Sequence, residues 1–151
     1  MKKACVLVAE SNGDWARTSV VYRNEGGEVA VAGKELLVFA YMAKERSYPD
    51  TDVDADGNNV QRENFKRIRN YLLGYISDSN DYGATEDFQT VNAIEKDSEV
   101  IYLVSIKRDE DDTVKITVKY LEFDDECADF EDKVQALIDG NIGNDVDLCI
   151  M

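Results

Sequence analysis

Apolar and polar residues alternate strictly near the middle of the second half of the chain. Residues 114–123, VKITVKYLEF, place every second side chain on one apolar face, as in an antiparallel strand half buried against a core. The preceding run, Glu99–Lys107, is apolar on both faces and therefore predicts a strand inside the sheet. A short polar loop joins the two runs, so together they predict a β-hairpin.

Helical spacing follows this hairpin directly. Within Asp124–Gly140, the apolar residues Phe130, Val134, Leu137 and Ile138 recur every three or four positions, which predicts an amphipathic helix with one apolar stripe. Acidic residues stand at its amino end, where the helix dipole favours negative charge, and the closing glycine suits the position just after the last helical residue.

Two further β-rich runs open the chain. Ala4–Ser11 and Trp15–Arg23 flank the dipeptide Asn12-Gly13. Asn-Gly between such runs is the strongest short-range hairpin signal, because both turn positions take positive φ. After a second turn, Glu28–Ala32 has the composition of a third strand, so the three runs predict a β-meander.

Two longer segments predict helices. Gly33 is placed to cap a largely apolar helix that ends by Arg46, but a buried strand over Leu36–Met42 fits the same apolar run, and periodicity does not decide between them. The second segment, Gln61–Ser77, has a regular apolar stripe. The main basic cluster of the chain crowds its polar face and consists of Arg62, Lys66, Arg67 and Arg69.

The segment Asp78–Ser98 carries weaker signals. A structureless loop of that length is unusual in a compact domain. Thr85 is placed to cap a short helix, and its apolar residues Phe88, Val91 and Ile94 would then face inward.

The chain closes on an alternating segment. Asp145–Met151 places Val146, Leu148 and Ile150 on one face, as in a terminal strand that returns to the sheet. With the elements above, we expect one α+β domain over residues 1–151, with a mostly antiparallel sheet of five to six strands and two to four helices packed on it.

The charge balance limits the partners. The chain has 17 Lys and Arg residues against 32 Asp and Glu residues, which is a formal net charge of −15. A field of that sign repels nucleic acid and anionic membrane surfaces, and it attracts basic protein surfaces. We therefore expect a basic protein as the partner, and neither nucleic acid nor a membrane. The oligomeric state stays open.

The cysteines and the longest apolar runs bear on the compartment. Cys5, Cys127 and Cys149 are far apart and form no Cys-x-x-Cys pair, a pattern typical of reduced thiols in a reducing compartment. No apolar run approaches the ~20 residues that span a bilayer. The apolar run after Lys3 is too short for a signal peptide. The sequence thus predicts a cytoplasmic protein.

Histidine is absent from the chain. This excludes Ser-His-Asp and Cys-His catalysis and histidine-dependent zinc sites, and it removes the commonest general base. The composition therefore favours a binding protein over an enzyme, and no catalytic residue is assigned.

One acidic loop carries a metal-binding pattern. Residues 52–63, DVDADGNNVQRE, match D-x-D-x-D-G-x5-E and resemble the calcium loop of the EF-hand family. Calcium takes oxygen ligands, so alternating aspartates and a later bidentate glutamate can wrap one ion. The resemblance implies that the ligands are Asp52, Asp54, Asp56, the backbone carbonyl of Asn58, Val60 (through its backbone or a water) and Glu63.

The loop also departs from the family pattern. Asn59 stands where the family has an aliphatic residue, Pro49 interrupts the entering helix, and there is no second loop. The alternative interpretation is an acidic loop in which Asn58 or Asn59 caps the helix that follows. Ca²⁺ is the one cofactor that the sequence indicates; the alternative requires none.

Acidic residues concentrate at the predicted hairpin tip and at the start of the last predicted helix. Within that span Lys115 and Lys119 are the only basic residues. Adjacent carboxylates repel one another unless solvent or a basic partner screens them. The candidate partner-binding residues are Asp109, Glu110, Asp111, Asp112, Asp124, Asp125, Glu126, Asp129, Glu131 and Asp132.

The leading hypothesis is a non-enzymatic acidic binding protein that engages a basic protein surface. In charge and size the chain is similar to small acidic proteins that act as nucleic-acid mimics, immunity proteins or phage-encoded inhibitors of host defence. The mechanism would be that carboxylates occupy the positions of phosphates. The alternatives are a calcium-binding module and a structural subunit of a larger assembly, and a metal-dependent enzyme ranks last.

Overall fold

A computed structural model describes residues 2–11, 16–46, 56, 61–108, 114–123 and 129–146, with the backbone alone at 61–67 and 108. In these ranges six strands form one sheet and three α-helices cover it, so the predicted α+β class is confirmed. The strands are β1 (Ala4–Ser11), β2 (Ala16–Arg23), β3 (Glu86–Asp87), β4 (Val100–Arg108), β5 (Val114–Glu122) and β6 (Asn144–Asp145). The helices are α1 (Lys34–Arg46), α2 (Gln61–Asp78) and α3 (Phe130–Ile138), with a π-helical segment η1 (Val29–Gly33) and a 3-10 turn η2 (Val91–Ala93).

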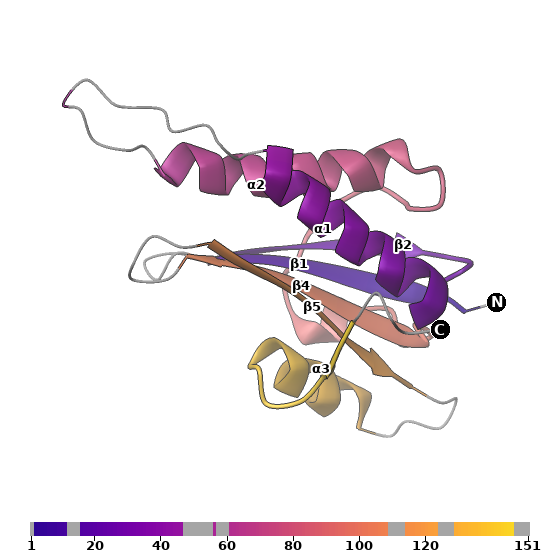
Figure 1. Cartoon of the computed structure of the whole chain (residues 1–151). Coiled ribbons are helices and arrows are strands. Elements are labelled where there is room, and N and C mark those ends of the chain that lie inside the picture. Colours follow the sequence, from indigo (N-terminus) through magenta and orange to yellow (C-terminus); the bar gives the residue numbers. More distant parts are fainter. Residues whose placement is uncertain are drawn as a thin grey trace.

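The sheet is built from the two predicted hairpins. Its strand order is β3-β2-β1-β4-β5-β6. β1 and β4 pair in parallel at the centre, and all other neighbours pair antiparallel. Helices α1 and α2 lie over one face of the sheet, and α3 lies over the other (Figure 1). The sheet is thus the middle of three layers.

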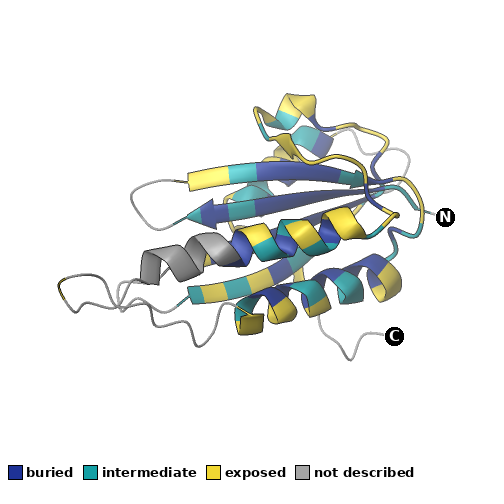
Figure 2. Cartoon of the chain, turned by 90° about the horizontal axis from the view of Figure 1, so that it is seen from above, coloured by how far each residue is buried: buried dark blue, intermediate teal, exposed yellow. Residues whose placement is uncertain are grey.

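The three layers explain why the central strands are apolar on both faces. Alternate residues of β1 point to opposite sides: Val6 and Val8 join the core cluster under α1 and α2, whereas Cys5 and Leu7 join the cluster under α3. β4 divides in the same way. Seen from above, the helices of the upper layer are buried along their inner side and exposed along their outer side (Figure 2).

The segment predicted as a third strand is helical, so the predicted β-meander is wrong. Val29–Gly33 forms η1, which runs directly into α1. Val29, Ala32 and Gly33 are buried and continue, at helical spacing, into the buried Leu36 of α1. Packing against the sheet therefore overrides the β propensity of the valines. For Leu36–Met42 the helix is confirmed over the alternative strand.

The strand that pairs with the outer edge of β2 comes from much later in the chain. Glu86 and Asp87 form β3, so the short helix predicted from Thr85 is wrong. Backbone hydrogen bonds hold this segment along β2, with the Phe88 N–H donating to the Thr18 carbonyl at 3.0 Å. The inward orientation predicted for the apolar residues is nevertheless confirmed, since Phe88, Val91 and Ile94 pack into the cluster under α3.

The last helix begins and ends by recognisable rules. α3 starts at Phe130, and the predicted residues 124–128 lie outside the described ranges. It ends in a Schellman motif: Gly140 has φ +82°, its N–H donates to the Leu137 carbonyl, and the Asn141 N–H donates to the Ala136 carbonyl at 2.9 Å.

The terminal strand is confirmed over its described residues. β6 pairs with β5, and Val146 is buried, whereas 147–151 lie outside the described ranges. None of the described helices is both long enough and apolar enough to span a bilayer.

Candidate partner-binding surface

Three of the ten predicted partner-binding carboxylates belong to the described structure. Asp129, Glu131 and Asp132 lie at the amino end of α3, where the helix dipole favours negative charge. The other seven lie in the ranges 109–112 and 124–126, outside the described residues.

Lysines partly neutralise this helix start, which corrects the expectation that only Lys115 and Lys119 lie near it. The Lys133 ammonium is 3.6 Å from the Asp129 carboxylate, one helical turn away. The Lys96 ammonium, from the loop after η2, is 3.2 Å from the Glu131 carboxylate. All four side chains are well exposed, so each pair contributes little to stability. The surface is acidic but not purely acidic.

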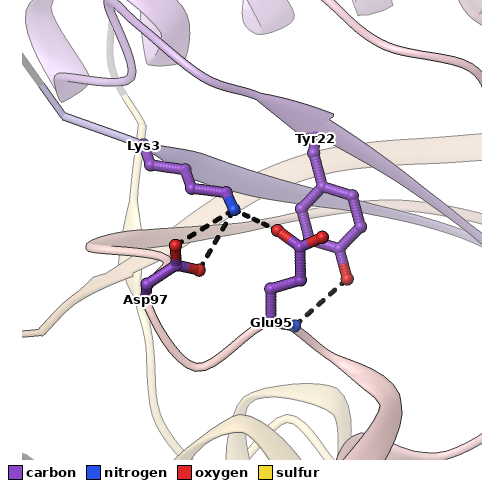
Figure 3. Close-up of polar contacts among 4 residues, drawn as sticks. All are labelled: Lys3, Tyr22, Glu95 and Asp97. Carbon is purple, nitrogen blue, oxygen red and sulfur yellow. Dashed lines mark hydrogen bonds and ion pairs between the residues drawn. The ribbon is translucent and has the colours of Figure 1, made fainter.

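Two further carboxylates lie on this side of the molecule, and sequence reasoning missed them. Glu95 and Asp97, from the same loop as Lys96, converge on Lys3 just before β1 (Figure 3). The Lys3 ammonium donates to Glu95 and to both oxygens of Asp97, at 3.1 and 3.2 Å. The hydroxyl of Tyr22 accepts a hydrogen bond from the Glu95 N–H at 3.2 Å.

The cluster around Lys3 fixes the position of the loop. The hydrogen bond to Glu95 raises the pKa of the Lys3 ammonium, so the lysine stays charged. The Glu99 N–H also donates to the Lys3 carbonyl at 2.8 Å. The loop is thereby tied to the first strand and presents Lys96 to α3. We call the carboxylates of this loop and of the α3 start the acidic face; its members are Glu95, Asp97, Asp129, Glu131 and Asp132.

The predicted calcium loop lies almost entirely outside the described residues. Asp52, Asp54, Asn58 and Val60 are not described, and Asp56 sits in an exposed turn. Glu63 falls in the first turn of α2, where only the backbone is described. Within the ranges given above, no three His, Cys, Asp or Glu side chains are grouped to hold a metal. Calcium binding stays a prediction, which calorimetric titration with Ca²⁺ and a Glu63→Gln variant tests.

Arg69 is buried against the sheet, which corrects its predicted place in the basic cluster on the polar face of α2. Its side chain is only 6% exposed and lies against β2, where it donates to the Ser19 hydroxyl. Burial and the nearby Arg17 lower the pKa of the Arg69 guanidinium. Arg69 therefore fastens α2 to the sheet and offers no charge to a partner. The other three members of the cluster, Arg62, Lys66 and Arg67, have no described side chains.

Cys5 and two buried tyrosines are not activated as nucleophiles. Cys5 is fully buried, and its burial raises the pKa of the thiol to about 12, so it is protonated at neutral pH. Burial likewise raises the pKa of the Tyr82 and Tyr102 hydroxyls. Reactive cysteines have lowered pKa values and some exposure, so Cys5 is a core residue.

The buried thiol has a consequence at alkaline pH. In the unfolded chain a thiol ionises near pH 8.5, so unfolding above that pH releases a proton that the folded state retains. The contribution of the protonated thiol to stability is fully present below this pH, and it is lost as the pH rises toward 12. We expect the free energy of unfolding to drop by about 2 kcal/mol between pH 8.5 and 10.

Denaturant unfolding at a series of pH values, under reducing conditions, measures this slope. Cys5→Ala should start from a lower stability but decline less steeply over the same window. Cys127 and Cys149 are present in both proteins, so their contribution cancels. Parallel slopes for the two proteins would contradict the assignment to Cys5.

No family model, no curated protein and no solved structure matches the chain.

Proposed function

We propose that the protein is a non-enzymatic inhibitor that binds the basic surface of a nucleic-acid-binding protein. Its carboxylates take the positions of phosphates on that surface, and ion pairs with lysine and arginine hold it there. The observation that carries the proposal is the acidic face. Two segments more than thirty residues apart in sequence bring exposed carboxylates together there, in a chain of net charge −15.

The anchoring of the loop supports a binding role. Lys3 holds Glu95 and Asp97 in place before any partner arrives, which lowers the entropy lost on association. The sequence of the hairpin tip adds four consecutive acidic residues, Asp109–Asp112. A basic partner would compete with Lys96 for Glu131, so part of the internal pairing is exchanged when the complex forms.

The test is capture from a lysate of the source cell with three immobilised proteins. The acidic-face variant carries Asp129→Asn, Glu131→Gln and Asp132→Asn. The control variant carries Glu25→Gln, Asp78→Asn and Glu86→Gln, which removes the same number of charges at exposed sites elsewhere. We expect wild type and control to retain a basic nucleic-acid-binding protein that the acidic-face variant releases. Duplex DNA should elute that protein, because both ligands use one basic surface.

Association kinetics with the captured protein sharpen the test. Electrostatic steering predicts fast association at low salt that slows steeply as salt rises. Lys96→Gln should accelerate association, since it frees Glu131 and adds net negative charge. Neutralising Asp109, Glu110, Asp111 and Asp112 together should slow it. A partner that DNA does not elute, or equal binding by the acidic-face and control variants, would overturn the proposal.

A further inference from the structure

Exposed residues follow the outer side of α1 (Figure 2), and several of those in η1 and α1 are large and apolar. Five large hydrophobic side chains are exposed among the described residues, and four of them belong to these two consecutive segments. Their exposed fractions are 47% for Val31, 41% for Val38, 55% for Tyr41 and 44% for Met42. Val38, Tyr41 and Met42 are neighbours on the surface of α1, at positions i, i+3 and i+4, and exposed apolar surface of this kind commonly marks a contact site. We call these four residues the α1 stripe.

Two charges of opposite sign flank the part of the stripe that lies on α1. Lys34, Val38, Tyr41 and Glu45 follow at intervals of four, three and four residues, so they form one line along the helix. In the described part of the chain, neither Lys34 nor Glu45 forms an ion pair. The line is therefore positive at its start, apolar in its middle and negative at its end.

Such a line is complementary to itself when it is reversed. If two copies of α1 pack antiparallel about a two-fold axis, Lys34 of each copy lies opposite Glu45 of the other, and Val38 lies opposite Tyr41. In a two-fold interface every contact occurs twice, so the Lys34–Glu45 pair forms at both ends of the paired helices. A positive start and a negative end on the same line thus make the charge of α1 complementary to a second copy of α1, which favours a second copy as the occupant.

The charge distribution also selects this face for self-association. Without the buried Arg69, α1 and α2 together carry six basic and four acidic residues, in a chain of net charge −15. Two copies therefore meet less repulsion through this layer than through the acidic face. The acidic face lies with α3 on the opposite side of the sheet (Figure 1). Contact through α1 thus leaves that face free.

We infer that the protein forms a homodimer in which the α1 stripes of two copies pack antiparallel, with Lys34 and Glu45 paired across the interface. The dimer presents two acidic faces, one on each outer side. This inference is independent of the proposed function, because it concerns the opposite face of the sheet.

Sedimentation equilibrium from micromolar to millimolar protein tests the dimer and its pairing. Lys34→Glu and Glu45→Lys should each weaken dimerisation roughly tenfold, because symmetry turns one reversal into two like-charge contacts. The double variant restores both pairs and the net charge, so it should dimerise like wild type. Glu45→Lys is decisive: it lowers the net negative charge, so general repulsion alone would make its dimer stronger.

An exposed apolar residue outside the stripe provides a matched control. Tyr41→Ser should shift the protein toward monomer, whereas Ile142→Ser, at a residue that is 38% exposed, should not. Circular dichroism confirms that each variant is folded. A wild type that stays monomeric throughout, a stronger dimer for Glu45→Lys, or a double variant no better than the single ones would each overturn the inference.

Discussion

Replacing Arg23 by methionine is expected to lower the free energy of unfolding by about 3 kcal/mol, because it leaves partly buried partners without their donor. The Arg23 side chain is 6% exposed, and one guanidinium nitrogen lies 2.8 Å from the Glu35 carboxylate. A second nitrogen donates to the Glu25 carbonyl at 2.8 Å, and the guanidinium stacks 5.0 Å from the Tyr82 ring centre. Methionine fills much of the same volume, so the loss reflects charge and hydrogen bonding and not a cavity.

The same substitution at Arg17 provides the control. Arg17 is on the same strand, but its ion pair with Asp87 is long, at 3.7 Å, and both side chains are more than half exposed. Exposed pairs of this kind contribute at most about 1 kcal/mol, so Arg17→Met should be nearly neutral. Urea unfolding of both variants gives the comparison. Equal losses for Arg17→Met and Arg23→Met would show that the burial of Arg23 confers no special role.

Elements with long, regular patterns could be predicted from the sequence, whereas the short segments η1 and β3 could not. The alternation of apolar and polar residues in β5 extends over several residue pairs, and the apolar stripe of α2 extends over several helical turns. Neither pattern fits a competing secondary structure. Val29–Gly33 is different, because it is short and valine-rich, and local propensity favours a strand. Its helical form depends on burial against the sheet, which becomes visible only in three dimensions. β3 has two residues, both acidic, and its pairing with β2 leaves no local signal.

The acidic face shows the same limit for the candidate site. Charge counting located the α3 start, because helix-initiating acids lie close together in sequence. It missed Glu95 and Asp97, which depend on a lysine about 90 positions earlier in the chain. It also missed the neutralising role of Lys96, and it placed Arg69 on the polar face of α2. In each case the deciding contact joins residues that only the sheet topology brings together.

Gly27→Ala and Gly74→Ala are expected to change stability in opposite directions. Gly27 lies where three segments meet: its N–H donates to the Lys2 carbonyl at 2.9 Å, and its carbonyl accepts from the buried Tyr102 hydroxyl at 2.6 Å. A Cβ there would lie 2.8 Å from both the Ala4 Cβ and the Lys2 carbonyl oxygen. The backbone must then shift and strain both hydrogen bonds, which should cost about 1–3 kcal/mol.

Gly74 lies inside α2, where a Cβ meets no atom within 4 Å. Alanine there should stabilise the protein by up to about 1 kcal/mol, since it restricts the unfolded chain and favours the helix. Both variants add one methyl group, so stability changes of opposite sign would reflect the different surroundings of the two glycines. Thermal and urea unfolding measure both. If Gly27→Ala were as stable as Gly74→Ala, the close approach of the β2–η1 connection to the start of β1 would be wrong.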